Sequence, residues 1–394
     1  MPTFYNYTQN GLIYSFDDVF VPADAFRTGN LWTWGRNDFG QLGINASGTT
    51  TNRTTPVTTF TGGANWRTIS GGADHYAGIK DDGTLWIWGL NAYGQLGVND
   101  TTNRPTPVTT FAGGTNWKQV HCGGNHSAAV KTDGTLWTWG RNAYGGLGIN
   151  NTTNRPTPVT TFAGGTNWKQ VSGGNFFVAA VKTDGTLWLW GDNLRGQLGV
   201  NNTTDRLTPV TTFAGGINWK QISCGINFVN AVKTDGTLWT WGGNAYGQLG
   251  VNDTTNRPTP VTTSVGGNDW KRPANTGGSQ DMSAVIKTNG TLWTWGRNNF
   301  GQLGVNDTTN RPTPVTTFAG GNNWKQVDCG YRHSGAVKTD GTLWTWGNNV
   351  YGQLGINNTT QRNSPVTTFA GGNNWKGIAL GDSTIAVTYI DPSI

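Results

Sequence analysis

Tryptophan residues recur along this chain at a nearly constant interval. A Trp-x-Trp-Gly unit occurs seven times, and each unit is followed by a single Trp that comes after Asn or Asp, which together account for all 21 tryptophans. The units begin at Trp32, Trp86, Trp137, Trp188, Trp239, Trp293 and Trp344. The interval is 51 residues, or 54 where three residues are added, near Ala46–Gly48 and near Arg272–Thr276. A period of about fifty residues is typical of the blades of a β-propeller.

Each unit contains four short segments with the pattern of β-strands. In one unit the first two are Trp117–Gly123 and Ser127–Thr132, and the Asp-Gly pair that follows them is typical of a type I′ hairpin turn. The third segment is Thr135–Gly140, and the fourth is Thr157–Phe162, where proline near the start suits an edge strand. Four strands cannot cover both of their own faces, whereas blades stacked around an axis can. The sequence therefore predicts an all-β, seven-bladed propeller with four-stranded blades.

The order of the strands predicts how the ring closes. The first complete strand is Asn30–Gly35, and the chain ends with the pattern of two further strands between Trp375 and Ile390. We expect Trp375–Ile390 to pair in one blade with Asn30–Gly35 and Pro56–Phe60. This two-plus-two splice of N-terminal and C-terminal strands would leave no open sheet edge.

Two recurring motifs resemble those of the regulator of chromosome condensation (RCC1-like) repeat family. They are the WGxNxxGQLG segments at Trp34–Gly43, Trp88–Gly97 and Trp346–Gly355, and the Gly-x-x-His elements at Gly72–His75, Gly123–His126 and Gly330–His333. The resemblance covers all seven units and implies a seven-bladed propeller. The best-known member is an exchange factor for a small nuclear GTPase that docks on chromatin. The near-identical units of this chain are similar in style to prokaryotic and tailed-phage members, and its sequence has no basic N-terminal tail and no wedge-like insertion.

Composition narrows the function classes. Charged residues make up only 12% of the chain, and the net charge is +6. The Lys and Arg residues recur at fixed positions of the repeat instead of clustering in the sequence, so we expect no nucleic-acid partner. The chain contains no apolar run of eighteen residues, so its sequence predicts no membrane span. We also find no secretory signal, and three Cys do not form a disulfide framework, so we expect synthesis in the cytoplasm.

No group of titratable residues predicts catalysis, and we expect neither a cofactor nor a metal ion. His75, His126 and His333 share a register that other units fill with Phe177, Phe228, Met282 and Thr384. A catalytic or metal-binding histidine would not be replaced by phenylalanine or methionine. The three cysteines also recur at one register, where small-residue packing is the simplest interpretation. We therefore expect a protein that is not an enzyme.

One face of the predicted propeller differs from blade to blade. The loops after the first strands carry Asp74, Asn125, Phe176, Asn227, Asp281, Arg332 and Ser383 at equivalent positions. The loops after the third strands carry a mostly aromatic ring, Phe39, Tyr93, Tyr144, Arg195, Tyr246, Phe300 and Tyr351. The aromatic side chains could pack between blades, or they could form a recognition face, since Tyr, Phe and Arg are enriched in interface cores. Both interpretations stay open at this point.

Residues 1–29 differ in pattern from the predicted propeller domain, residues 30–394. They alternate apolar and polar positions, which predicts an extended arm that must dock because it is too short to fold alone. The side chains that could anchor it are Phe4, Tyr5, Tyr7, Tyr14, Phe16 and Phe20. We expect the arm to contact a neighbouring subunit rather than its own propeller.

These features favour a non-enzymatic binding or structural protein. The leading hypothesis is a virion or tail component of a phage, anchored to neighbouring subunits by residues 1–29, with a cell-surface glycan or protein as the receptor. One alternative is an intracellular protein-interaction module or exchange factor for a small GTPase, and another is a glycan-binding lectin.

Overall fold

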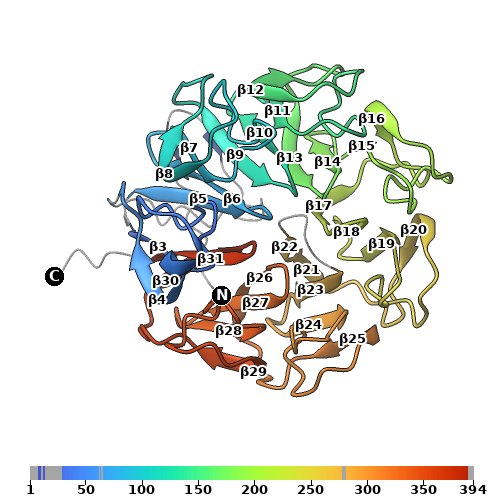
Figure 1. The fold of residues 1–394 in the computed structure, drawn as a ribbon. Coiled ribbons are helices and arrows are strands. Elements are labelled where there is room, and N and C mark those ends of the chain that lie inside the picture. Colours follow the sequence, from blue (N-terminus) through green and yellow to red (C-terminus); the bar gives the residue numbers. More distant parts are fainter. Residues whose placement is uncertain are drawn as a thin grey trace.

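The computed structural model describes residues 29–388 except for 62, 64 and 277–280, and before them only the short strand pair β1 (Thr8–Gln9) and β2 (Leu12–Ile13). The six candidate anchor residues of the arm lie outside the described residues. Seven sheets surround a central axis, so the seven-bladed, all-β prediction is confirmed (Figure 1). The described residues contain no helix that is long and apolar enough to cross a membrane.

We number the blades from the first one built from consecutive strands. Blade 1 is β5 (Trp66–Gly71), β6 (His75–Lys80), β7 (Leu85–Gly89) and β8 (Arg104–Thr109). Blade 2 is β9 (Trp117–Cys122), β10 (His126–Lys131), β11 (Leu136–Gly140) and β12 (Arg155–Thr160). Blade 3 is β13 (Trp168–Gly173), β14 (Phe177–Lys182), β15 (Leu187–Gly191) and β16 (Arg206–Thr211). Blade 4 is β17 (Trp219–Cys224), β18 (Phe228–Lys233), β19 (Leu238–Gly242) and β20 (Arg257–Thr262).

Among the remaining blades, blade 5 has a broken first strand and blade 7 is built from both ends of the chain. Blade 5 is β21 (Trp270–Pro273), β23 (Met282–Lys287), β24 (Leu292–Gly296) and β25 (Arg311–Thr316). Blade 6 is β26 (Trp324–Cys329), β27 (His333–Lys338), β28 (Leu343–Gly347) and β29 (Arg362–Thr367). Blade 7 is β30 (Trp375–Leu380), β31 (Ser383–Thr388), β3 (Leu31–Gly35) and β4 (Arg53–Thr58). The loop between β3 and β4 contains the short 3-10 helix η1 (Thr49–Thr51).

Blade 7 joins the two ends of the chain in the predicted way. β31 pairs with β3 in antiparallel register, with Trp32 opposite Ala386, and β30 and β4 complete the sheet. The two-plus-two splice is therefore confirmed. The faces of blade 7 pack against β26 and β27 of blade 6 and against β5 of blade 1, so the splice leaves neither neighbouring blade with an uncovered face.

In blade 5 the first strand breaks where three residues are added. β21 ends at Pro273, which has no N–H to continue the ladder. The chain then leaves this sheet, and β22 (Asn275–Thr276) pairs in parallel with β26 of blade 6, with Asn275 opposite Asp328. The inner wall at this joint is thus shared between two blades.

The hydrophobic core lies between adjacent blades and is built around tryptophan. Trp139 is fully buried and its Nε1 donates to the main-chain oxygen of Gln95 in blade 1, at 2.9 Å. Trp117 lies edge-on to Trp137 and Trp139, with ring centroids 6.2 Å apart in both cases. The Nζ of Lys131, the last residue of β10, lies 4.6 Å from the ring centroids of Trp117 and Trp137, a cation–π contact with both rings.

The turns between the second and third strands differ from the predicted type I′. In blade 2 only Gly134 has positive φ, at 78°, and its N–H donates to the main-chain oxygen of Lys131 at 3.0 Å. Asp133 is outside the left-handed region, and its Oδ1 accepts from the N–H of Thr135 at 2.9 Å. The loop is therefore longer than a two-residue type I′ turn, and glycine is its only left-handed residue. The type I′ prediction is wrong because the Asp133 carboxylate stabilises a turn in which Asp133 itself does not have positive φ.

Candidate binding face

The loops after the first and third strands of each blade form one face of the disc, which we call the variable face. The side chain of an asparagine holds each loop after the third strand in shape. In blade 1, Asn91 Nδ2 donates to the main-chain oxygens of Asp100 and Thr102, and Asn91 Oδ1 accepts from the N–H of Leu96 at 2.9 Å. Gln95 Oε1 accepts from the N–H of the aromatic residue Tyr93 at 2.9 Å. These bonds explain the recurring Asn and Gln of the motif.

Glycines in the same loops let neighbouring blades approach. Gly94 has a φ of 79°, and a Cβ placed on it would lie 2.5 Å from the Cα of Pro156 in blade 2. Gly97 has a φ of 65°, and its Cβ would lie 2.8 Å from Nε1 of Trp139. Each loop therefore sits against the next blade, so that its aromatic residue is placed at a joint between blades.

The aromatic ring both packs between blades and remains accessible. Phe39, Tyr93, Tyr246 and Phe300 are half-buried, whereas Tyr144, Arg195 and Tyr351 are exposed. Most of them stack against an arginine of a neighbouring loop. The centroid distances are 4.7 Å for Arg141 over Tyr93, 4.8 Å for Arg297 over Tyr246, 4.8 Å for Arg332 over Phe300 and 5.5 Å for Arg36 over Tyr351. The two interpretations left open by the sequence are therefore not exclusive.

Blade 3 interrupts this arrangement with an open pocket of about 450 Å³. Its lining includes four of the predicted face residues, Tyr144, Phe176, Arg195 and Asn227. The rings of Tyr144 and Phe176 lie 5.2 Å apart, and Arg141 lies 4.8 Å from the centroid of Phe176. The predicted face residues are thus gathered into one concave site here.

Sequence reasoning missed two important residues of this pocket, Leu194 and Asp192. Leu194 is 70% exposed, the second highest fraction among the exposed large hydrophobic side chains of the described residues. Asp192 is largely buried, its Oδ2 accepts from Gln197 Nε2 at 2.8 Å, and burial raises its pKa. The signal was present, because the Asp-Asn-Leu-Arg sequence of blade 3 departs from the Asn-Ala-Tyr pattern of other units.

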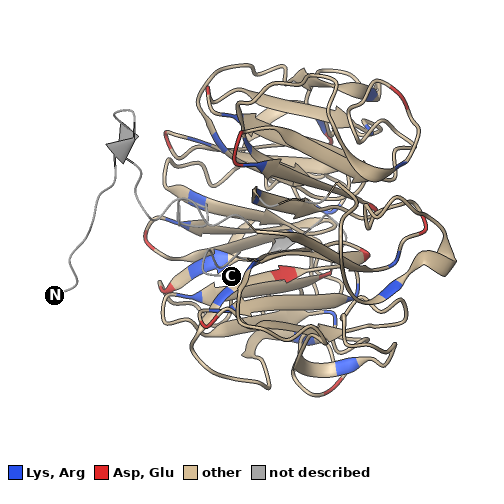
Figure 2. Ribbon diagram, turned by 90° about the vertical axis from the view of Figure 1, so that its left-hand side faces the viewer, with Lys and Arg blue, Asp and Glu red and all other residues tan. Residues whose placement is uncertain are grey.

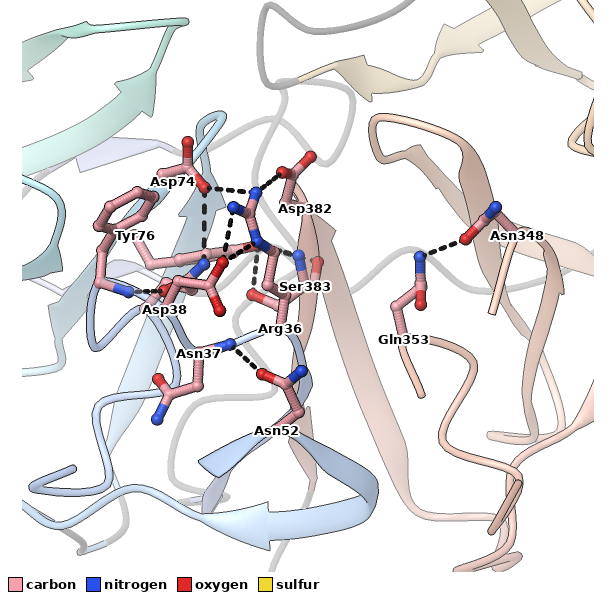
Figure 3. Close-up of polar contacts among 12 residues, drawn as sticks. Arg36, Asn37, Asp38, Asn52, Asp74, Tyr76, Asn348, Gln353, Asp382 and Ser383 are labelled. Carbon is pink, nitrogen blue, oxygen red and sulfur yellow. Dashed lines mark hydrogen bonds and ion pairs between the residues drawn. The ribbon is translucent and has the colours of Figure 1, made fainter. Parts of the chain in front are cut away.

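A second, charged site lies where blade 7 meets blade 1. Arg36, directly after β3, donates from Nε to Asp38 Oδ2 at 2.7 Å and from Nη1 to Asp382 Oδ2 at 2.6 Å. Its Nη1 lies 3.6 Å from Asp74 Oδ1 of blade 1. Figure 3 shows the guanidinium group between the carboxylates of Asp74 and Asp382. This cluster ties the splice blade to its neighbour on the variable face.

Burial and mutual repulsion perturb the acidic groups of this cluster. Burial, with the nearby charge of Asp382, raises the pKa of Asp74 to about 7, although Arg36 opposes the shift. Burial also raises the pKa of Asp382.

The predicted face residues Asp281 and Asn125 lie at other joints. Asp281, which lies 3.7 Å from Arg297, has its pKa raised by burial too. Asn125 is half-buried, and its main-chain oxygen accepts from the N–H of Arg141 at 2.9 Å.

The predicted register of blade 7 was wrong by one residue. Ser383 pairs with Gly35 as His75 pairs with Gly89, so Asp382, not Ser383, is the equivalent of Asp74. By the same pairing, Ser383 rather than Thr384 is the equivalent of the histidines. The loop before β31 is one residue shorter than in blade 1, which shifted an alignment made by residue spacing.

The histidines and cysteines of the ring are packed as expected. His75 Nε2 lies 2.9 Å from Ser127 Oγ, and His333 Nε2 lies 2.9 Å from Thr384 Oγ1, each in the next blade. Burial lowers the pKa of both histidines to about 3. Burial raises the pKa of the Cys122 thiol to about 12. Within the described part of the chain, no three His, Cys, Asp or Glu side chains are grouped so that they could hold a metal ion.

Comparisons with known proteins place this geometry in a family. Residues 113–391 match the model of the RCC1-like domain, and residues 28–79 and 82–130 match that of the regulator of chromosome condensation (RCC1) repeat. The Ultraviolet-B receptor UVR8 of Arabidopsis thaliana is 34% identical over 340 residues, which cover 84% of this chain and 76% of the receptor. The E3 ubiquitin-protein ligase HERC2 of Homo sapiens is 29% identical over 352 residues, which cover 86% of this chain but 7% of the ligase.

Solved structures agree on the fold. Prp20p of Saccharomyces cerevisiae superposes with a TM-score of 0.79 at 18% identity, covering 94% of this chain and 93% of that one. Human WBSCR16 superposes with a TM-score of 0.77 at 22% identity, covering 93% of this chain and 100% of that one. At these identities the likeness concerns the fold alone. Family models that match most of the seven-bladed ring, and a receptor similar along most of its length, show that the chain belongs to the regulator of chromosome condensation (RCC1) repeat family.

Proposed function

We propose that this chain is a non-enzymatic protein-interaction module that binds a partner protein through the variable face, centred on the pocket of blade 3. The observation that carries the proposal is the group Tyr144, Phe176, Leu194 and Arg195, which combines exposed apolar surface with a cation in a concave site. Tyr, Phe and Arg are the side chains enriched in interface cores. The polar rim of the pocket consists of Asn and Asp side chains, which can orient a partner.

The related proteins support an interaction role. Prp20p is described with binding properties toward Gsp1p and histones, and yeast RCC1 (Prp20) has been crystallised bound to Kap60. These partners belong to that protein. The comparisons do not support the expected virion or tail association, and they favour the protein-interaction alternative. Exchange activity on a GTPase is a narrower form of this alternative. It would require an insertion long enough to form a wedge against the GTPase, whereas the repeat intervals of this sequence differ by only three residues.

The proposal can be tested with two probes on opposite faces of the same blade. Leu194 and Phe213 are 70% and 67% exposed, but Leu194 lies on the variable face and Phe213 follows β16 on the other face. A photo-crosslinking amino acid is placed at each position in turn, and the protein is irradiated in an extract of its source cells. We expect a discrete protein adduct from position 194, lost when Tyr144→Ala is added, and none of the same mass from position 213. Equal adducts from both positions would contradict the proposal, and so would saturable glycan binding that requires the same residues.

A further inference from the structure

A ring of cations surrounds the central axis on the face opposite the variable face. In every unit, the residue after the single Trp is basic, and we call this set the cationic ring: Arg67, Lys118, Lys169, Lys220, Lys271, Lys325 and Lys376. Each is the second residue of the first strand of its blade, and these strands contact one another around the axis. Each strand runs from its basic residue toward a loop of the variable face, so the basic residues lie at the opposite end.

This ring corrects a conclusion drawn from sequence spacing. Basic residues separated by about fifty positions look dispersed along a chain. In side view, Lys and Arg are indeed scattered over the outside of the ribbon (Figure 2). Closure of the propeller nevertheless places one member of the series from every blade at the same level around the axis, because equivalent positions of all blades lie at equal distance from it. Five of the seven line the cavity described next.

The mouth of the central channel is a cavity of about 490 Å³ whose lining is strongly cationic. Its basic lining residues are Arg67, Lys220, Lys271, Arg272, Lys287, Lys325 and Lys376, and no described Asp or Glu side chain is among the lining residues. Two hairpin turns contribute to the lining, one through Asn289 and the other through Thr339, and in the first of them Asn289 replaces the Asp of the other turns. A concave site lined by charges of one sign focuses the electric field and concentrates counter-ions.

Carboxylates lie near some of these cations, but outside the lining. Lys287 Nζ lies 3.0 Å from Asp269 Oδ1, outside the lining. Asp328 is buried in the wall near Arg272, and burial raises the pKa of this carboxyl well above its usual range. Lys271 is exposed and Lys220 is partly exposed, so both can reach a ligand in the mouth. The described lining residues include seven Lys and Arg and no Asp or Glu, so the lining itself is positively charged.

We propose that the channel mouth binds a compact anion that carries several phosphate groups. Lysine is a common ligand of phosphate, acting as a point charge with three donors. The cations come from different blades and point charge at one volume from several directions, which suits a small polyvalent anion better than a single carboxylate. The amide side chains of Gln170, Gln221 and Asn289 in the lining add neutral donors. The volume is that of a small-molecule site.

The test is titration calorimetry of the full chain with inorganic triphosphate. We expect one saturable site per chain, weakened by added salt because the mouth is partly screened by solvent. The double variant Lys220→Ala/Lys271→Ala should weaken binding at least about tenfold, since the loss of even one charge-assisted hydrogen bond is worth roughly that factor. Lys220→Arg/Lys271→Arg should retain binding. Thermal unfolding of each variant shows whether the ring is intact.

The matched control is Arg155→Ala/Arg362→Ala, which lowers the net charge equally but on the outermost strands. It should leave binding unchanged, and equal weakening by both double variants would reduce the effect to net charge and overturn the proposal. Absence of saturable binding at millimolar triphosphate would overturn it too. Adenosine triphosphate without metal should bind through the same lysines. Binding of the nucleotide but not of inorganic triphosphate, or tighter binding of a single-stranded oligonucleotide, would show that a run of phosphates is not what the site recognises.

Discussion

At the scale of single residues, the variable face is built from exceptions to the repeat. Asn and Gln positions of the loops are the same in nearly every blade because they form the hydrogen bonds that shape the loop. Leu194 and Asp192 of blade 3 stand at loop positions that differ from blade to blade, and Asp192 keeps the loop bonded by accepting from the N–H of Leu194 at 3.0 Å and from Gln197. Arg36 and its three carboxylates are likewise particular to the joint between blades 7 and 1.

Asp74 gives this joint a dependence on pH. Its pKa in the folded protein is about 7, above the usual value of 3.8 for an aspartate. The folded chain therefore holds a proton that the unfolded chain has lost between these values, and folding stability falls as pH rises through this window, by at most about 1.4 kcal/mol per pH unit. We predict that Asp74→Asn removes part of this fall. The measurement is the free energy of unfolding by denaturant for both proteins from pH 5 to pH 8. Parallel curves for the two proteins would contradict the prediction.

At the scale of strands and loops, much of the fold could be predicted from the sequence. The Trp interval gave the number of blades, and the strand order gave the splice, because both depend on patterns that repeat seven times. Two local features could not be obtained in this way. The shorter loop before Ser383 displaced the alignment by one residue, and the Asp-Gly turn depends on a hydrogen bond from Thr135 to Asp133 that a turn signature does not reveal.

The loops also predict which glycines are essential to blade packing. Gly97 and Gly113 both have positive φ, at 65° and 53°, so alanine is strained at either position. A Cβ at Gly97 would lie 2.8 Å from the Trp139 ring, whereas a Cβ at Gly113 would meet nothing within 4 Å. We predict that Gly113→Ala costs about 1 kcal/mol and that Gly97→Ala costs at least about 1 kcal/mol more, because the next blade must shift. Chemical denaturation of the two variants provides the comparison, and equal losses would show that the joint can accommodate a methyl group.

At the scale of the whole molecule, circular closure brings residues of distant repeats together. It gathers equivalent residues of distant repeats at one radius, which creates the cationic ring and the variable face from a sequence that looks uniform. The sequence predicted which loops share a face, but it could not predict the pocket of blade 3 or the charge of the channel, because both depend on distances between neighbouring blades.

Closure also predicts the effect of removing the C-terminal strands. Deletion of residues 375–394 removes β30 and β31, which leaves β3 and β4 as a two-stranded remnant and exposes the faces of blades 6 and 1 that β30 and β31 cover. We predict loss of cooperative unfolding in differential scanning calorimetry. Deletion of residues 389–394 is the control, since it keeps all four strands of blade 7 and should retain one sharp transition. A single sharp transition in the longer deletion would mean that closure is not required for folding.

We propose that the variable face binds a protein partner at blade 3. The most direct test of this proposal is the affinity of the protein captured at position 194 for the wild-type chain, for Leu194→Asp and for Phe213→Asp, measured by titration calorimetry. The two substitutions place the same charge on equally exposed apolar residues of one blade, on opposite faces. We predict that Leu194→Asp weakens binding by about 2 kcal/mol or more, roughly thirtyfold, as loss of a central apolar contact does, and that Phe213→Asp leaves it unchanged. Unchanged affinity of Leu194→Asp, or an equal loss in both variants, would contradict the claim.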